Sequence, residues 1–168
     1  MYLEDMPLVP FDSLPASARV WIFASDAPLT GDRAARLLAE VDGYLAQWKA
    51  HGHPLTCGRT WRDDRFLAVA VDQSNAYASG CSIDGLFRML QTLQPALGTS
   101  MVGGGQVHYR DPTGALRSAT REAFAALSST GDVTNETPVF DTTVATAGEW
   151  RDRFETVVGR SWHRALIA

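Results

Sequence analysis

Two uninterrupted apolar runs of strand length place the strongest limit on how this chain folds. Residues 20–24 read VWIFA, and residues 66–71 read FLAVAV. A strand that is apolar on both faces needs cover on both faces, so each run predicts a central strand of a layered sheet. Both runs are far shorter than the roughly 18 apolar residues of a membrane-spanning helix. The sequence therefore predicts a layered protein that neither spans nor binds a membrane.

Helical periodicity follows each apolar run. The segment 30–52 has apolar residues on one stripe and predicts a long amphipathic helix that Gly52 ends. Apolar residues return at the same spacing from Ile83, and Pro95 is expected to end this second helix. Ser82 is placed to cap its first turn.

The order of these patterns predicts the fold class. Residues 56–62 and 65–71 predict two strands joined by a tight turn, and residues 106–110 (QVHYR) predict a further strand. Residues 1–110 thus follow the β-α-β-β-α-β order of the ferredoxin-like fold. Residues 111–168 predict a small β-α-β-α appendage. We predict an α+β protein in which this appendage packs on the core and the whole chain is one folding unit.

Charge and composition exclude several classes of protein. The chain has 19 acidic and 15 basic residues, a net charge of -4, and no window that collects five or six basic residues, so we predict no nucleic-acid partner. Its first residues carry acids and prolines where a secretory signal has a basic start, which predicts a cytoplasmic protein. Cys57 and Cys81 are too few for a disulfide framework, and we expect both to be reduced.

Cys81 has two interpretations that the sequence leaves open. It lies in SNAYASGCSIDGLF (74–87), just ahead of the predicted second helix, where a helix dipole favours a thiolate. Cys81 is therefore a candidate nucleophile, with His51 or His163 as its base. Against this, Asp84 in the same turn disfavours a second negative charge, and no CX5R pattern follows. The alternative is that Cys81 is a small residue chosen for packing.

Two further motifs are interpreted as structural. HGHPLTC (51–57) holds two histidines and a cysteine without a CxxC or HExxH motif, so we predict a polar connection and no metal site. GGGQ (103–106) lacks the Lys-Ser/Thr of a Walker loop and leads into a strand, so we predict no nucleotide and no other cofactor.

Five segments together resemble a known family. They are WIF (21–23), QWKAHGHPL (47–55), ASGCSID (78–84), TPVFDTTVAT (137–146) and SWH (161–163). Across nearly the whole chain these segments are similar to a family of short bacterial proteins that carry the label "ABC transporter ATPase". That activity needs a Walker lysine, a Walker B acid and a signature motif, which this chain lacks, so we expect no ATPase. The resemblance implies pocket residues in the recurring elements, in addition to the three catalytic candidates: Ser79, Gly80, Ser82, Asp84, Asp141 and Trp162.

A second resemblance concerns residues 108–141 alone. Their hairpin, short helix and TPVF segment are similar to the second class of GYF-like modules, which implies protein or peptide contacts.

No complete catalytic motif is present, so we predict a binding or accessory protein that catalyses nothing. Its ligand is an unidentified protein or small molecule, and a homodimer stays open. The alternative is a thiol-dependent enzyme of the acyl-transfer or hydrolase type with Cys81 as nucleophile.

Overall fold

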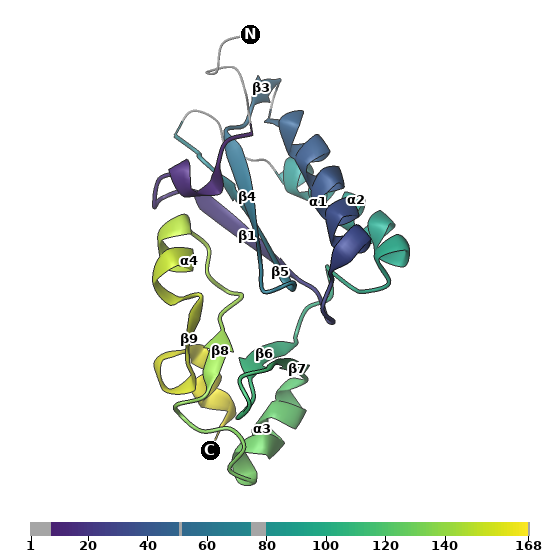
Figure 1. Cartoon of the computed structure of the whole chain (residues 1–168). Coiled ribbons are helices and arrows are strands. Elements are labelled where there is room, and N and C mark those ends of the chain that lie inside the picture. The colour runs from purple at the N-terminus through teal and green to yellow at the C-terminus, as the bar shows by residue number, and fades with distance from the viewer. Residues whose placement is uncertain (1–7, 51, 75–79, 168) are drawn as a thin grey trace. The chain divides into compact units, whose positions relative to one another are not determined.

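The computed structural model describes residues 8–50, 52–74 and 80–167 (Figure 1). In these residues the chain is an α+β protein with four α-helices, antiparallel sheets of three and four strands, and one small two-stranded pair. It divides into two compact units. Unit 1 is Met1–Val102 with Val144–Trp150, and unit 2 is Gly103–Thr143 with Arg151–Ala168. Whether both fold as one unit stays a prediction. No helix in the described ranges is long and apolar enough to cross a membrane.

The sheet of unit 1 has the order β1-β5-β4, with β1 at Arg19–Ala24, β5 at Phe66–Val71 and β4 at Cys57–Arg62. Every residue of β5 is buried, which confirms that FLAVAV is a central strand. The same prediction for VWIFA was wrong, because β1 lies at the edge of this sheet. Among the described residues, the segment that contains Ala145 and Thr146 pairs with the start of the outer edge of β1, where the Val20 N–H donates to the Ala145 carbonyl at 2.9 Å.

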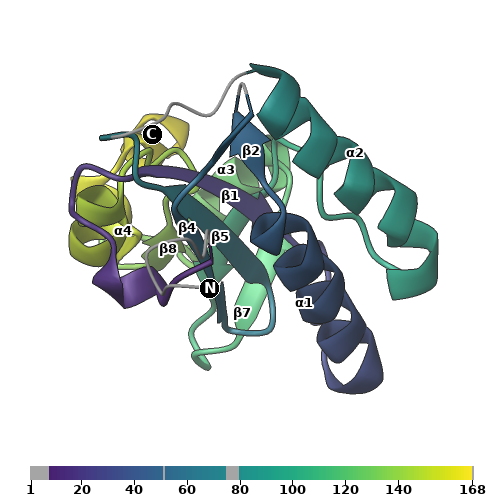
Figure 2. The same ribbon diagram turned by 90° about the horizontal axis from the view of Figure 1, so that it is seen from above.

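Helices α1 (Gly31–Ala46) and α2 (Gly80–Leu97) lie side by side on one face of this sheet (Figures 1 and 2). The predicted extension of the first helix to Gly52 was wrong. Helix α1 ends earlier because the chain next forms a tight antiparallel pair of strands, β2 (Lys49–Ala50) and β3 (His53–Pro54). The apolar stripe predicted for α1 is confirmed at Leu37, Val41 and Leu45, which are fully buried.

Helix α2 begins and ends at other residues than the sequence predicts. Pro95 lies inside the last turn of the helix rather than beyond its end. A proline there removes one hydrogen bond close to where the helix stops, and packing of neighbouring turns retains the helical path. The helix also begins at Gly80, so Cys81 and Ser82 belong to its first turn, and Ser82 is not the capping residue.

The opposite face of the sheet is covered by the N-terminal segment. Successive side chains of a strand point to opposite faces, so β5 contributes to two cores. The side chains of Leu67, Val69 and Val71 enter the core under the helices. Its small residues Ala68 and Ala70 face the other way, and Phe11 and Leu14 pack in the core on that side. The Val9 N–H donates to the Cys57 carbonyl at 2.8 Å and joins this segment to β4.

Unit 2 is built on a sheet of order β7-β6-β8-β9 (Figure 1). The strands are β6 (Val107–Arg110), β7 (Leu116–Ala119), β8 (Pro138–Phe140) and β9 (Glu155–Val157), and helix α3 (Arg121–Ser129) connects β7 to β8. The ferredoxin-like fold requires β6 as the fourth strand of the first sheet. Because β6 pairs with β7 and β8 instead, the strand order does not confirm a ferredoxin-like arrangement.

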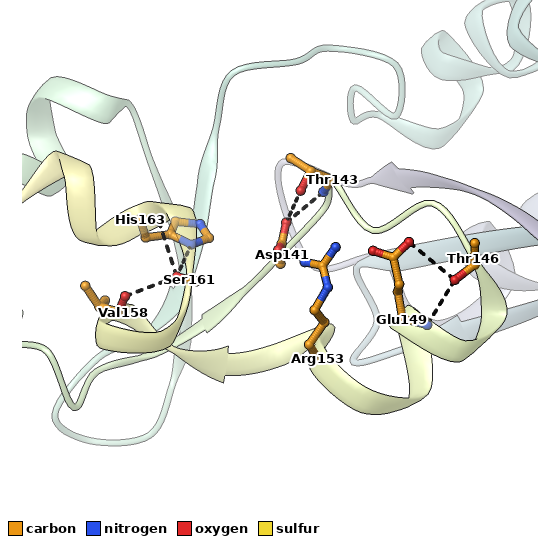
Figure 3. Close-up of polar contacts among 8 residues, drawn as sticks. All are labelled: Asp141, Thr143, Thr146, Glu149, Arg153, Val158, Ser161 and His163. Atoms are coloured by element: carbon orange, nitrogen blue, oxygen red, sulfur yellow. Dashed lines mark hydrogen bonds and ion pairs between the residues drawn. The ribbon is translucent and has the colours of Figure 1, made fainter. Parts of the chain in front are cut away.

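Two threonines cap the helices of the C-terminal part, and the sequence predicts the second of these caps through the Thr-x-x-Glu pattern at residues 146–149. The Oγ1 of Thr120 accepts the Ala123 N–H at 3.1 Å at the start of α3. The Oγ1 of Thr146 accepts the Glu149 N–H at 3.1 Å, and its hydroxyl donates to a Glu149 carboxylate oxygen at 3.3 Å (Figure 3). These contacts confirm the capping pair that begins α4 (Ala147–Arg153).

Candidate functional site

The residues predicted as a site belong to different units. Asp84 is an exposed residue of α2 in unit 1, whereas Asp141, Trp162 and His163 belong to unit 2. Several candidates lie outside the described residues, either wholly or in their side chains: His51, Ser79, Gly80, Cys81 and Ser82. The choice between a nucleophilic and a packed Cys81 therefore stays a prediction.

Asp141 is a buried carboxylate that holds the end of β8 (Figure 3). Its side chain is 3% exposed, and one oxygen accepts hydrogen bonds from the Thr143 N–H at 2.9 Å and the Thr143 hydroxyl at 2.5 Å. The other oxygen accepts a hydrogen bond from the Arg153 guanidinium at 2.5 Å. Since an ion pair and two further hydrogen bonds hold the carboxylate, it ties the turn after β8 to the end of α4.

His163 lies in the core of unit 2. The residue is 1% exposed, and its Nδ1 is 2.8 Å from the Ser161 Oγ (Figure 3). Its ring stacks on that of Trp162, with centroids 4.0 Å apart. It also makes an edge-to-face contact with the Phe124 ring, with centroids 6.2 Å apart. The indole N–H of Trp162 is buried without a hydrogen-bond partner in the described ranges. These contacts make His163 part of an aromatic cluster.

Burial controls the ionisation of His163. It lowers the pKa of the imidazole from 6.5 to about 4, the charge of Asp141 opposes this shift, and the charge of Arg121 adds to it. The imidazole is therefore neutral at pH 7.

Cys57, the other cysteine, is fully buried in β4, and its thiol donates to the Leu45 carbonyl at 3.6 Å. Burial raises the pKa of the Cys57 thiol to about 12. No group of three His, Cys, Asp or Glu side chains in the described part of the chain is arranged to hold a metal ion.

We predict that Cys57 does not react with iodoacetamide at pH 8 in the native protein, because the nucleophile is the thiolate and the thiol is buried. In a Cys81→Ser variant, where Cys57 is the single cysteine, mass spectrometry should show alkylation only after urea is added. Native alkylation at the rate of the unfolded chain would contradict this burial.

A groove of about 400 Å³ lies between α1 and α2 in unit 1. Three of its lining residues are apolar and are called the floor below: Met89, Leu93 and Ala96. The other four are charged or polar and are called the rim: Arg36, Glu40, Arg88 and Thr92. Leu93 is part of the core of unit 1, and Met89 packs against it. An apolar group in the groove would therefore extend that core.

The two helices approach closely at both ends of the groove. At one end Gly85 of α2 faces Tyr44 of α1, where a Cβ on residue 85 would collide with the phenol oxygen. At the other end the Arg33 guanidinium donates to the Leu97 carbonyl at 3.3 Å. These contacts show that α1 and α2 are antiparallel and fix the spacing between them.

The charged groups at the rim make few polar contacts with the described residues. Arg36 and Glu40 form no hydrogen bond or ion pair with a described residue. Arg88 donates its Nε–H to the Asp84 carbonyl of its own helix at 3.3 Å and forms no ion pair with the residues that the structure describes. The groove thus combines an apolar floor with charges that remain available to a ligand.

Two further cavities are less suited to an apolar ligand. One, of about 430 Å³ in unit 2, is lined mainly by polar residues of the turns that follow β6 and α3. The other, of about 310 Å³, contains Arg59 and Asp42, whose charges pair through hydrogen bonds of 2.8 and 2.9 Å.

The sequence did not reveal the groove. Arg36 and Glu40 are one helical turn apart, a spacing that is ordinary for a solvated helix face. Only the pairing of two helices brings them beside Met89 and Leu93. Comparisons of the chain with protein-family models, curated proteins and solved structures found no match.

Proposed function

We propose that the chain is a cytoplasmic binding or accessory protein that catalyses no reaction, and that the α1/α2 groove is its ligand-binding site. The observation that carries this proposal is an apolar floor continuous with the core, beside charges that form no ion pair with a described residue. Ligand sites have this character, with apolar walls, a few polar groups and volumes of roughly 300–1,000 Å³.

The candidates in unit 2 support a role outside catalysis. Asp141 is occupied by Thr143 and Arg153, and His163 is enclosed by aromatic rings. Groups held in this way stabilise the fold and present little surface to a substrate.

A binding role is tested by filling the groove with a large side chain. Thr92 is exposed and lines the groove, so Thr92→Trp should occupy it without disturbing the core. Gln91→Trp is the matched control, because residue 91 is exposed on the same helix but does not line the groove. We expect a fragment library screened by 15N–1H NMR to perturb amides of α1 and α2 in the wild type and in Gln91→Trp, and to leave them unperturbed in Thr92→Trp. Fragment binding that is absent, or unaffected by Thr92→Trp, would contradict the proposal.

A thiol-dependent enzyme is the second candidate, and the place of Cys81 in the first turn of α2 favours it. The positive end of the helix dipole lies there and stabilises a thiolate. The test is the pH dependence of iodoacetamide alkylation in a Cys57→Ser variant. An apparent pKa well below about 8.5 would support the enzyme, whereas alkylation only after unfolding would exclude it.

A further inference from the structure

We infer that the α1/α2 groove takes a small amphipathic carboxylate, whose apolar body lies on the floor while its carboxylate meets Arg36 and Arg88. This inference rests on the proposed binding function of the groove. It adds the chemical class of the ligand.

The length of the floor determines the size of the ligand's apolar part. Met89, Leu93 and Ala96 follow the axis of α2, and the groove residues of this helix run from Arg88 to Ala96. At about 1.5 Å per residue this is a span of roughly 12 Å. That length fits a short alkyl chain or one aromatic ring and is too short to seat a long helix. Each methylene placed there contributes about 0.8 kcal/mol of hydrophobic free energy.

The rim sets the charge of the ligand. Arg36 and Arg88 are two positive groups against the single negative Glu40, so the groove is locally positive on a chain of net charge -4. Guanidinium groups bind carboxylates through paired, charge-assisted hydrogen bonds. Neither arginine has a carboxylate partner among the described residues. Glu40 repels a second negative charge and therefore favours a ligand with one carboxylate.

Three probes that share one alkyl chain test the charge preference: octanoate, octylammonium and octanol. Each is titrated into 15N-labelled full-length protein at low ionic strength, and amide shifts are followed by NMR. We expect octanoate to shift amides of α1 and α2 and to bind at least ten-fold more tightly than octylammonium. Arg36→Gln and Arg88→Gln should each weaken octanoate binding several-fold and leave octanol binding unchanged. Arg62→Gln, with the same loss of charge at a position outside the groove, is the control.

The outcomes separate this inference from the function on which it rests. Equal binding of octanoate, octylammonium and octanol in the groove would overturn the carboxylate preference and leave a binding groove intact. Fragment binding in the groove without any octanoate binding would also overturn the inference alone. If no compound of any charge perturbs the groove, both the inference and the proposed function fail.

Discussion

Replacing Gly58 with alanine is expected to lower the free energy of unfolding by about 3 kcal/mol or more, a loss similar to that of a buried phenylalanine side chain. The cause is a close backbone approach at the edge of β4. A Cβ on residue 58 would lie 2.6 Å from the Val9 carbonyl oxygen and 3.1 Å from the Phe11 Cα. Both are backbone atoms, so no side-chain rotation relieves the collision, and the N-terminal segment must move away from the sheet.

This movement removes the cover from one face of unit 1. Phe11 and Leu14 are 6% and 4% exposed, and they protect the alanines of β5 on that face. Urea denaturation followed by circular dichroism gives the free energy of unfolding. Gly43→Ala is the matched control, because its added Cβ meets no described atom within 4 Å beyond its chain neighbours and its own helix backbone, and the residue is in the middle of α1. It should raise stability by about 0.5–1 kcal/mol. Equal effects of the two substitutions would refute the close approach at Gly58.

Lowering the pH from 7 to 4 is expected to remove about 3 kcal/mol of stability through His163 alone. Burial lowers the pKa of this imidazole from 6.5 to about 4 in the folded protein. Between these values the unfolded chain binds a proton that the folded chain does not. Stability therefore falls as the pH decreases through this window, and it is fully present above about pH 6.5.

A His163→Phe variant isolates this contribution. Phenylalanine keeps an aromatic ring beside Trp162 and Phe124 but has no proton to bind. We expect the free energy of unfolding of wild type to fall by about 3 kcal/mol more than that of the variant between pH 7 and pH 4. NMR titration of the imidazole gives an independent value of the folded pKa. Parallel pH profiles for the two proteins would show that His163 is not buried as the structure describes.

Local patterns predicted several elements correctly because their causes lie within a few residues. The apolar stripe of α1 depends on spacing along one helix, and the burial of FLAVAV depends on an unbroken apolar run. The turn between β4 and β5 falls at Asp63 and Asp64, whose φ angles of 56° and 55° lie in the left-handed region that aspartate tolerates.

Elements whose limits depend on distant partners were predicted less well. The run in β1 is as apolar as β5, yet only strand pairing shows that β1 lies at an edge. Helix α1 ends at Ala46 because β2 and β3 pair beyond it, and α2 includes Pro95 because its turn packs on the core. In each case contacts made after folding outweigh a modest local preference.

The candidate site residues also divide into those that the sequence indicated and those that only the tertiary structure brings together. Asp141, Trp162 and His163 were selected from sequence, and the structure finds Asp141 and His163 deeply buried, but their buried contacts belong to the fold of unit 2. The groove residues Arg36 and Arg88 belong to no sequence motif, so the sequence did not mark them as candidates.

By itself, the sequence determined the α+β class, most helices and strands, and the capping box at Thr146, since propensity, periodicity and capping act over one or two turns. Only the tertiary structure decided which sheet β6 joins and which side chains meet in the α1/α2 groove. Strand pairing and helix packing join residues far apart in the chain, and their free energy depends on shape and burial that no local pattern records.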